Sequence, residues 1–124
     1  MKTKVSLLVV EISDRPRNNG VVPLRVLVDN DNRVIGKYIS TKSIDDTISE
    51  VLSKYSNNLD TRYCKIDLVD FFHEASSDEC EVLYMVKMPY HLISPTKESK
   101  LLDIDDANIE EKYGRSIQQT ARSV

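Results

Sequence analysis

Val5 to Val10, broken by Ser6, is the longest apolar run of the chain, and from Val5 to Ile12 apolar side chains occupy both alternating sets of positions. The six positions are Val5, Leu7 and Val9 on one set, and Leu8, Val10 and Ile12 on the other. Because successive side chains of a β-strand point to opposite faces, a strand of this kind must be covered on both sides. The run therefore predicts a central strand in a sheet with packed layers on both faces.

A first hairpin is predicted directly after this strand. Residues 13–20 gather Pro, Asn, Gly and charge, which is typical of a loop that ends a strand. Residues 24–28 and 33–39 are apolar and β-branched, and they flank an Asp-Asn-Asp-Asn tetrad at 29–32. Asp and Asn tolerate left-handed backbone, so we expect the two stretches to pair across this turn.

A second hairpin is predicted from residues 65–73 and 79–88, with a turn at 76–78 and Pro89 as the end of the second strand. Strict alternation would divide the side chains of the first stretch between two faces. It places Ile66, Leu68 and Asp70 on one face, and Asp67, Val69 and Phe71 on the other.

Residues 43–56 carry the clearest helical pattern. Ser43 is a suitable N-cap, and acids at 45 and 46 suit the positive end of the helix dipole. The helical face that we expect in the core consists of Ile44, Ile48, Val51, Leu52 and Tyr55. A final helix is predicted from Ile109, Tyr113, Ile117 and Ala121, although Gly114 weakens it by about 1 kcal/mol relative to alanine.

These elements predict an α+β fold of the α/β/α sandwich type, with a mixed sheet, one helix after the first hairpin and one at the C-terminus. A length of 124 residues suits one domain, spanning residues 1–124. We expect a core from about 3 to 113 and a tail at 114–124 that frays.

Charge and composition restrict the classes of molecule that the protein is expected to bind. With 17 basic and 20 acidic residues mixed along the chain, there is no basic stripe, which disfavours nucleic acid. No apolar run approaches the roughly 20 residues of a membrane span, and residues 5–10 make no convincing secretory signal, so we expect a cytoplasmic protein that binds no membrane. Cys64 and Cys80 have neither disulfide-framework nor zinc spacing, and we expect both to be buried.

The order of strand, hairpin, capped helix, hairpin and helix resembles the Nudix superfamily, most specifically at residues 35–59. That family's box places a glycine, a glutamate six positions later, an Arg-Glu, a glutamate pair and a glycine on a loop, helix and loop. The segment GKYISTKSIDDTISEVLSKYSNNL has the length and apolar rhythm of the box. Its residues 42–45 stand where the family has a Glu-Ser-Leu-Glu opening.

The resemblance implies a diphosphate-binding fold, but the box has lost its metal ligands. Glu50 and Val51 stand at the Arg-Glu position, and Lys54 and Tyr55 replace the glutamate pair. Mg²⁺ and Mn²⁺ need several oxygen ligands, which valine and lysine do not supply. We therefore expect no catalytic residues, no metal and no cofactor, and we retain Glu50, Lys54 and Tyr55 as candidate binding residues.

His73 and Glu74, at the predicted end of a strand, complete the candidate binding set. They would suit an acid–base pair, although a solvated strand end is the simpler interpretation. The tetrad at 29–32 resembles a calcium loop only in its start, since Arg33 and Val34 stand where an acid or amide and a glycine are needed. The acids at 103–111 suit either a solvated surface or a docking face.

Three hypotheses of function follow. The first is a non-catalytic Nudix-like interaction protein, of accessory or phage type, that docks on a protein partner or binds a small ligand. The second is a divergent Nudix hydrolase of nucleoside diphosphate derivatives that uses Mg²⁺ or Mn²⁺. The third is a structural subunit of a larger assembly.

Overall fold

The computed structural model describes residues 2–12, 24–39, 43–57, 59, 61–89, 92–107 and 109–122. The helices and strands are, in chain order, β1 (Lys2–Ile12), β2 (Leu24–Asp29), β3 (Ile35–Tyr38), α1 (Ile44–Tyr55), the 3₁₀ turn η1 (Thr61–Tyr63), β4 (Lys65–His73), β5 (Glu79–Pro89), β6 (Ser99–Asp103), the 3₁₀ turn η2 (Glu111–Tyr113) and α2 (Gly114–Arg122). Six strands form one sheet in the order β4-β5-β1-β2-β6, and β3 also pairs with β1. The sheet is mixed, because β1 and β5 run parallel and the other pairs are antiparallel.

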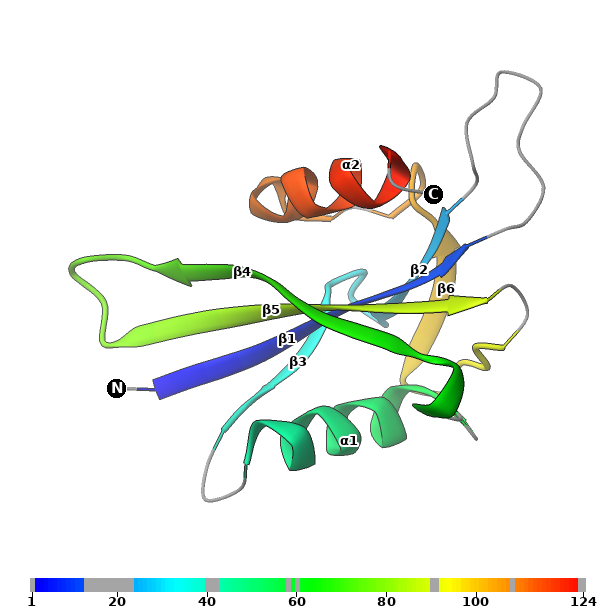
Figure 1. Cartoon of the computed structure of the whole chain (residues 1–124), viewed down its shortest axis with the longest axis horizontal. Helices are drawn as coiled ribbons and strands as arrows, with labels where there is room; N and C mark the ends of the chain where they lie inside the picture. The colour runs from blue at the N-terminus through cyan, green and yellow to red at the C-terminus, as the bar shows by residue number, and fades with distance from the viewer. Residues whose placement is uncertain are drawn as a thin grey trace.

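The prediction of a central strand covered on both faces is confirmed. Figure 1 shows the sheet nearly edge-on, with α1 on one side and α2 on the other. On one face of β1, Val5, Leu7 and Val9 pack with α1 in an apolar cluster that we call the α1 cluster. On the other face, Leu8 and Val10 pack in a second cluster with Tyr113 and Ile117. Glu11 is the exception near the end of the strand: it is fully buried and forms an ion pair with Arg25 of β2.

The first predicted hairpin is wrong in its strand pairing. The turn exists, with Asn32 at φ 63° and its N–H donating to the Asp29 carbonyl over 3.0 Å. The strands around it, however, pair with each other only through an isolated bridge between Val28 and Val34. Instead, β2 pairs with residues 9–12 of β1, and β3 pairs with residues 4–7 of the same strand. Because β1 is 11 residues long, one of its edges accommodates both short strands in succession.

The predicted helix at 43–56 is confirmed as α1. The Ser43 hydroxyl oxygen accepts a hydrogen bond from the Asp46 N–H, and Ser56 is the C-cap. Four of the five expected core residues are buried or packed against the core, whereas Ile44 in the first turn is 37% exposed.

The second hairpin is confirmed, with β4 and β5 antiparallel, but its pairing shifts by one residue at Val69. Leu68 lies opposite Tyr84, and Phe71 lies opposite Val82, and both of these partners pack in the α1 cluster. Phe71 therefore shares a face with Leu68, and the alternation that separated them is wrong. An extra residue in one strand reverses the alternation beyond it, as in a β-bulge.

At the C-terminus, η2 and α2 follow one another from Glu111 to Arg122. Ser116 is buried and Ile117 packs in the second cluster, so ordered core contacts continue into the segment expected to fray. Cys80 is buried as expected, whereas Cys64 is only half-buried, with its Sγ 2.9 Å from the Met88 Sδ. Within the described residues, no helix is long and apolar enough to span a membrane.

Candidate functional site

Helix α1 places the residues that the Nudix resemblance singled out. Val51 is 2% exposed and belongs to the core between α1 and the sheet. Glu50 is half-buried, and its Oε2 lies 2.7 Å from the Lys37 Nζ of β3. The carboxylate of Glu50, in the second half of the helix, is therefore already in a salt bridge with Lys37.

Lys54 and Tyr55 are also engaged within the chain. The Lys54 ammonium lies 5.1 Å from the centroid of the Tyr55 ring and 4.0 Å from the Glu98 Oε2. The Tyr55 side chain packs against the α1 cluster, and its carbonyl accepts a 2.5 Å hydrogen bond from the Ser99 hydroxyl. These contacts tie the end of α1 to the start of β6.

The α1 residues do not fit Mg²⁺ or Mn²⁺. A buried valine, a lysine and a core-packed tyrosine stand where a divalent cation needs carboxylate oxygens. Among the residues that the structure describes, no group of three or more His, Cys, Asp or Glu side chains is arranged to hold a metal.

A groove of about 340 Å³ lies between α1 and the sheet. Its walls are the α1 side chains Asp45, Ile48, Ser49 and Leu52, with Ile66 of β4 and Tyr84 of β5. Four of these six residues are apolar or aromatic, and Asp45 is the one acid among the described residues of the lining. The groove suits an apolar group better than a phosphate.

The groove continues into an exposed apolar surface on β4. We call Ile66, Leu68 and Phe71 the β4 apolar face, because all three lie opposite residues of the α1 cluster. Their exposed fractions are 37%, 59% and 58%. β4 is the last strand at its end of the sheet, so no further strand of the described chain covers it. Three large apolar side chains are therefore exposed together on one strand, an arrangement that is typical of interaction surfaces.

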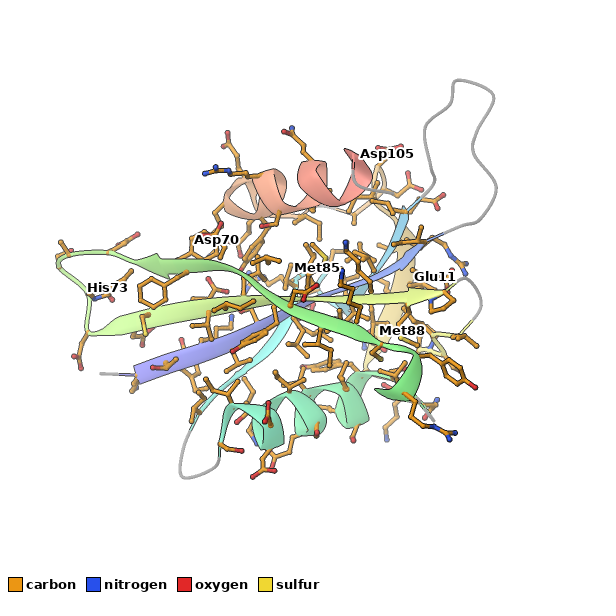
Figure 2. All side chains as sticks on the ribbon, viewed as in Figure 1. Glu11, Asp70, His73, Met85, Met88 and Asp105 are labelled. Atoms are coloured by element: carbon orange, nitrogen blue, oxygen red, sulfur yellow. The ribbon has the colours of Figure 1, made fainter. Side chains whose placement is uncertain are left out.

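A second, more polar cleft of about 680 Å³ lies near the turn of the β4–β5 hairpin. We call it the hairpin cleft. Its lining includes His73, Glu74, Glu79 and Glu81, together with Lys4 and Lys112. The His73 Nε2 lies 3.2 Å from the Ser77 carbonyl oxygen, a contact within the hairpin turn. Figure 2 shows His73 close to this turn, far from Glu11 at the other end of the sheet.

Glu81 is the centre of a hydrogen-bond network in the wall of the hairpin cleft. It is 7% exposed and accepts hydrogen bonds from the Ser6 hydroxyl and from the Tyr113 hydroxyl, the latter over 2.5 Å. The Lys112 Nζ lies 2.7 Å from its other oxygen and also sits over the rings of Phe72 and Tyr113. The network joins β1, β5 and η2.

The ionisable groups of this network shift one another's pKa values. Burial raises the pKa of Glu81, but hydrogen bonds from Lys112, Ser6 and Tyr113 outweigh it and hold that pKa below its ordinary value. Burial lowers the pKa of Lys112, and the ion pair with Glu81 reverses this and raises the pKa above its ordinary value. Burial and the hydrogen bond to Glu81 both raise the pKa of Tyr113. The ionised pair is thus a stable part of the fold.

The structure separates the five candidate binding residues into two groups. His73 and Glu74 line the hairpin cleft, whereas Glu50, Lys54 and Tyr55 line neither that cleft nor the α1 groove. The Glu81 network and the β4 apolar face were not predicted from the sequence. In the sequence, Glu81 alternates with apolar residues like any solvent-facing residue of a strand. Its part in the network becomes visible only through its contacts with Lys112 and Tyr113 of η2. Phe71 was assigned to the wrong face because the irregularity at Val69 has no clear sequence signal.

The sequence matches no protein-family model and no curated protein sequence. Several solved structures resemble the fold. A mutT/nudix family protein from Listeria innocua has a TM-score of 0.66 at 11% identity, with 98% of this chain and 92% of that chain covered. The NUDIX domain of Shewanella oneidensis NrtR, in a cocrystal structure with ADP ribose, has a TM-score of 0.59 at 14% identity, with coverage of 96% and 86%.

A MutT/nudix family protein from Enterococcus faecalis gives a TM-score of 0.57 at 12% identity. That comparison covers 82% of this chain but 43% of the longer chain. At identities this low the likeness concerns the fold, and it agrees with the mixed sheet and two helices described above. The chain has a Nudix-like α+β fold.

Proposed function

We propose that this protein is a non-catalytic Nudix-like interaction protein that binds a protein partner along β4. The observation that carries the proposal is the exposed β4 apolar face beside an apolar groove, on the same side of the sheet as α1. In this arrangement the chain serves as an accessory factor, and its Nudix-like fold supplies a rigid frame.

Helix α1 supports the non-catalytic part of the proposal. Hydrolysis of a diphosphate by this fold family relies on a divalent cation, which requires several carboxylates on one helical face. Val51 is in the core, Lys54 carries the same charge sign as the cation, and Glu50 already has a salt bridge to Lys37. A metal at α1 would have to break this pair and would gain one carboxylate.

Exposure on β4 supports the interaction part. Leu68 and Phe71 each expose more than half of their surface, although both are large apolar side chains. Burying an apolar surface against a partner yields about 25 cal/mol per Å². Binding of a partner that covers both side chains is therefore favoured over leaving these side chains in water.

The competing hypothesis is a divergent hydrolase that holds its metal with acids outside α1. One fold neighbour, the NrtR domain, is described in complex with ADP ribose, which makes this compound the first substrate to test. The hairpin cleft carries Glu74, Glu79 and Glu81, but Glu81 is engaged by Lys112 and Glu79 by the Tyr38 hydroxyl at 3.1 Å.

An activity assay separates the two hypotheses. The purified chain is incubated with Mg²⁺ or Mn²⁺ and a panel of nucleoside diphosphate compounds that includes ADP-ribose, and release of phosphate or mononucleotide is measured. We expect no turnover above the protein-free control. Turnover that disappears in Glu50→Gln or Glu74→Gln would overturn the non-catalytic proposal.

A capture experiment tests the interaction surface. Tagged wild type, Leu68→Lys and Leu92→Lys are compared as baits. Leu92 is 42% exposed and lies in the chain between β5 and β6, outside the β4 apolar face, so it controls for the general effect of placing lysine at an exposed leucine. Proteins bound by wild type and Leu92→Lys should be lost from Leu68→Lys. Equal capture by all three baits would contradict a role for β4.

A further inference from the structure

We propose that the partner bound along β4 is a second copy of this chain, paired edge to edge and antiparallel about a two-fold axis at Ile66. The inference rests on the proposed role of β4 as the binding surface and names its occupant. In this pairing Lys65 of each copy lies opposite Asp67 of the other, and the two sheets join into one.

The outer edge of β4 is available for this pairing. β4 ends the strand order of the sheet, and Figure 1 shows it in front of β5 with α1 and α2 lying to either side. Residues 65–68 pair in regular register with β5 before the shift at Val69. Their side chains are exposed on both faces. An uncovered strand edge offers its backbone N–H and C=O groups to another strand.

The charges on this segment select one register. A two-fold axis at Lys65 would place two lysines opposite each other, and an axis at Asp67 would place two aspartates opposite each other. Like charges directly opposite in a sheet are destabilising, and opposite charges are stabilising. An axis at Ile66 places Lys65 against Asp67 twice, because a two-fold contact repeats every pair. The segment is therefore self-complementary in one register.

The same register sorts the side chains by face. Lys65 and Asp67 lie opposite Lys87 and Met85 of β5, on the side of the sheet that α2 covers. Ile66 and Leu68 lie opposite Val86 and Tyr84, on the α1 side. In the pair, Ile66 meets Ile66 and Leu68 meets Cys64 on the α1 side, so apolar groups face apolar groups.

A local charge imbalance also favours the second copy. Within one chain, Lys65 lies opposite Lys87 of β5. Among the residues that the structure describes, the carboxylate paired with Lys65 is that of Asp67, 3.9 Å away. Asp67 of the second copy adds a carboxylate beside these two ammonium groups. The shift at Val69 ends the regular edge, and a two-fold contact uses the same patch on both copies, so the assembly closes as a dimer.

The test is the mass of the full-length chain in solution, measured by sedimentation over a range of concentrations for wild type and two charge reversals. Wild type should dimerise. Lys65→Asp gives a segment with two acids, and Asp67→Lys gives one with two lysines. Each variant alone meets only like charges, and we expect its dimerisation to weaken by about tenfold or more.

An equimolar mixture of the two variants is the decisive sample. Asp at position 65 of one chain then faces Lys at position 67 of the other, and the second pair is complementary as well. The mixture should therefore form a heterodimer that neither variant matches alone. Lys97→Asp, an exposed charge reversal in the loop before β6, is the matched control and should dimerise as wild type does. Circular dichroism checks that each variant is folded.

Three results would overturn the proposal: a wild type that stays monomeric, single reversals that dimerise as wild type, or a mixture without a heterodimer. None of these bears on hydrolysis, which the activity assay decides separately. A monomeric wild type whose β4 still captures another protein would leave the proposed function standing and remove only the second copy as its occupant.

Discussion

At the scale of single residues, Glu81 shows how one buried acid can connect distant segments. Its carboxylate accepts hydrogen bonds from β1 and η2 and pairs with Lys112, although these groups are far apart in sequence. Burial disfavours its charge, and three donors restore the charged form. A half-satisfied version of this network would be costly, because an unpaired buried charge loses its hydration.

Replacing this acid tests the network. Glu81→Gln should lower the free energy of unfolding by about 2 kcal/mol, because the amide cannot pair with Lys112. The folded pKa of Glu81 is below its ordinary 4.5, so the unfolded state takes up the proton first. The contribution of Glu81 to the free energy of unfolding is therefore fully present above pH 4.5. It is lost as the pH falls through the lower pKa of the folded state.

Urea unfolding at several pH values measures both effects. Glu81→Gln should be less stable at neutral pH and should lose less stability on acidification than wild type. Glu79→Gln, on the same strand but exposed, is the matched control and should follow wild type closely. An unchanged acid dependence in Glu81→Gln would show that this carboxylate is not responsible.

At the scale of elements, the close approach of β3 to β1 explains Gly36, the first residue of the segment that resembles the Nudix box. β3 lies against β1 so closely that a Cβ at Gly36 would be 2.6 Å from the Val5 carbonyl oxygen and 3.1 Å from the Ser6 Cα. Both of these are backbone atoms, so the strands themselves would have to move. The glycine therefore has a structural reason that is independent of any catalysis.

The two glycines Gly36 and Gly114 should respond oppositely to alanine. Gly36→Ala should destabilise the chain by about 1–3 kcal/mol through overpacking. Gly114 begins α2 with helical backbone and has no atom within 4 Å of an added Cβ, so Gly114→Ala should stabilise by about 0.4–1 kcal/mol. Thermal and urea unfolding of both variants check the signs. Destabilisation by both would show that η2 and α2 need glycine between them.

At the scale of the whole molecule, two separate cores hold the layers together. α1 closes one face of the sheet, and η2 with α2 closes the other through Tyr113 and Ile117. The second layer is thin, because α2 has 9 residues and few apolar side chains. Its contribution depends on a small number of contacts.

Ile117→Ala tests this second layer. Removing a half-buried isoleucine should cost about 1–2 kcal/mol, less than at a fully buried site. Arg115 is exposed and lies two residues before Ile117 in the same short helix, so Arg115→Ala should change stability by less than about 0.5 kcal/mol. Equal, negligible effects in urea unfolding would indicate that α2 contributes little to the core.

Much of the fold is a local property of the sequence. The cap at Ser43 and the spacing of Ile48, Val51 and Leu52 determine α1, because helix caps and helical faces involve residues a few positions apart. The two apolar sets of β1 determine a strand covered on both faces. The Nudix resemblance at 35–59 likewise predicted the Nudix-like fold.

The tertiary structure decided which groups meet. Pairing of β2 and β3 with one edge of β1, rather than with each other, depends on the length of β1 and on strands that lie far apart in sequence. The shift at Val69 turned Phe71 onto the face of Leu68, and η2 brought Lys112 and Tyr113 to Glu81. Local sequence fixes periodicity and capping, because these depend on neighbours along the chain. The exposed β4 face and the hairpin cleft depend on contacts across the sheet, which only the packed chain defines.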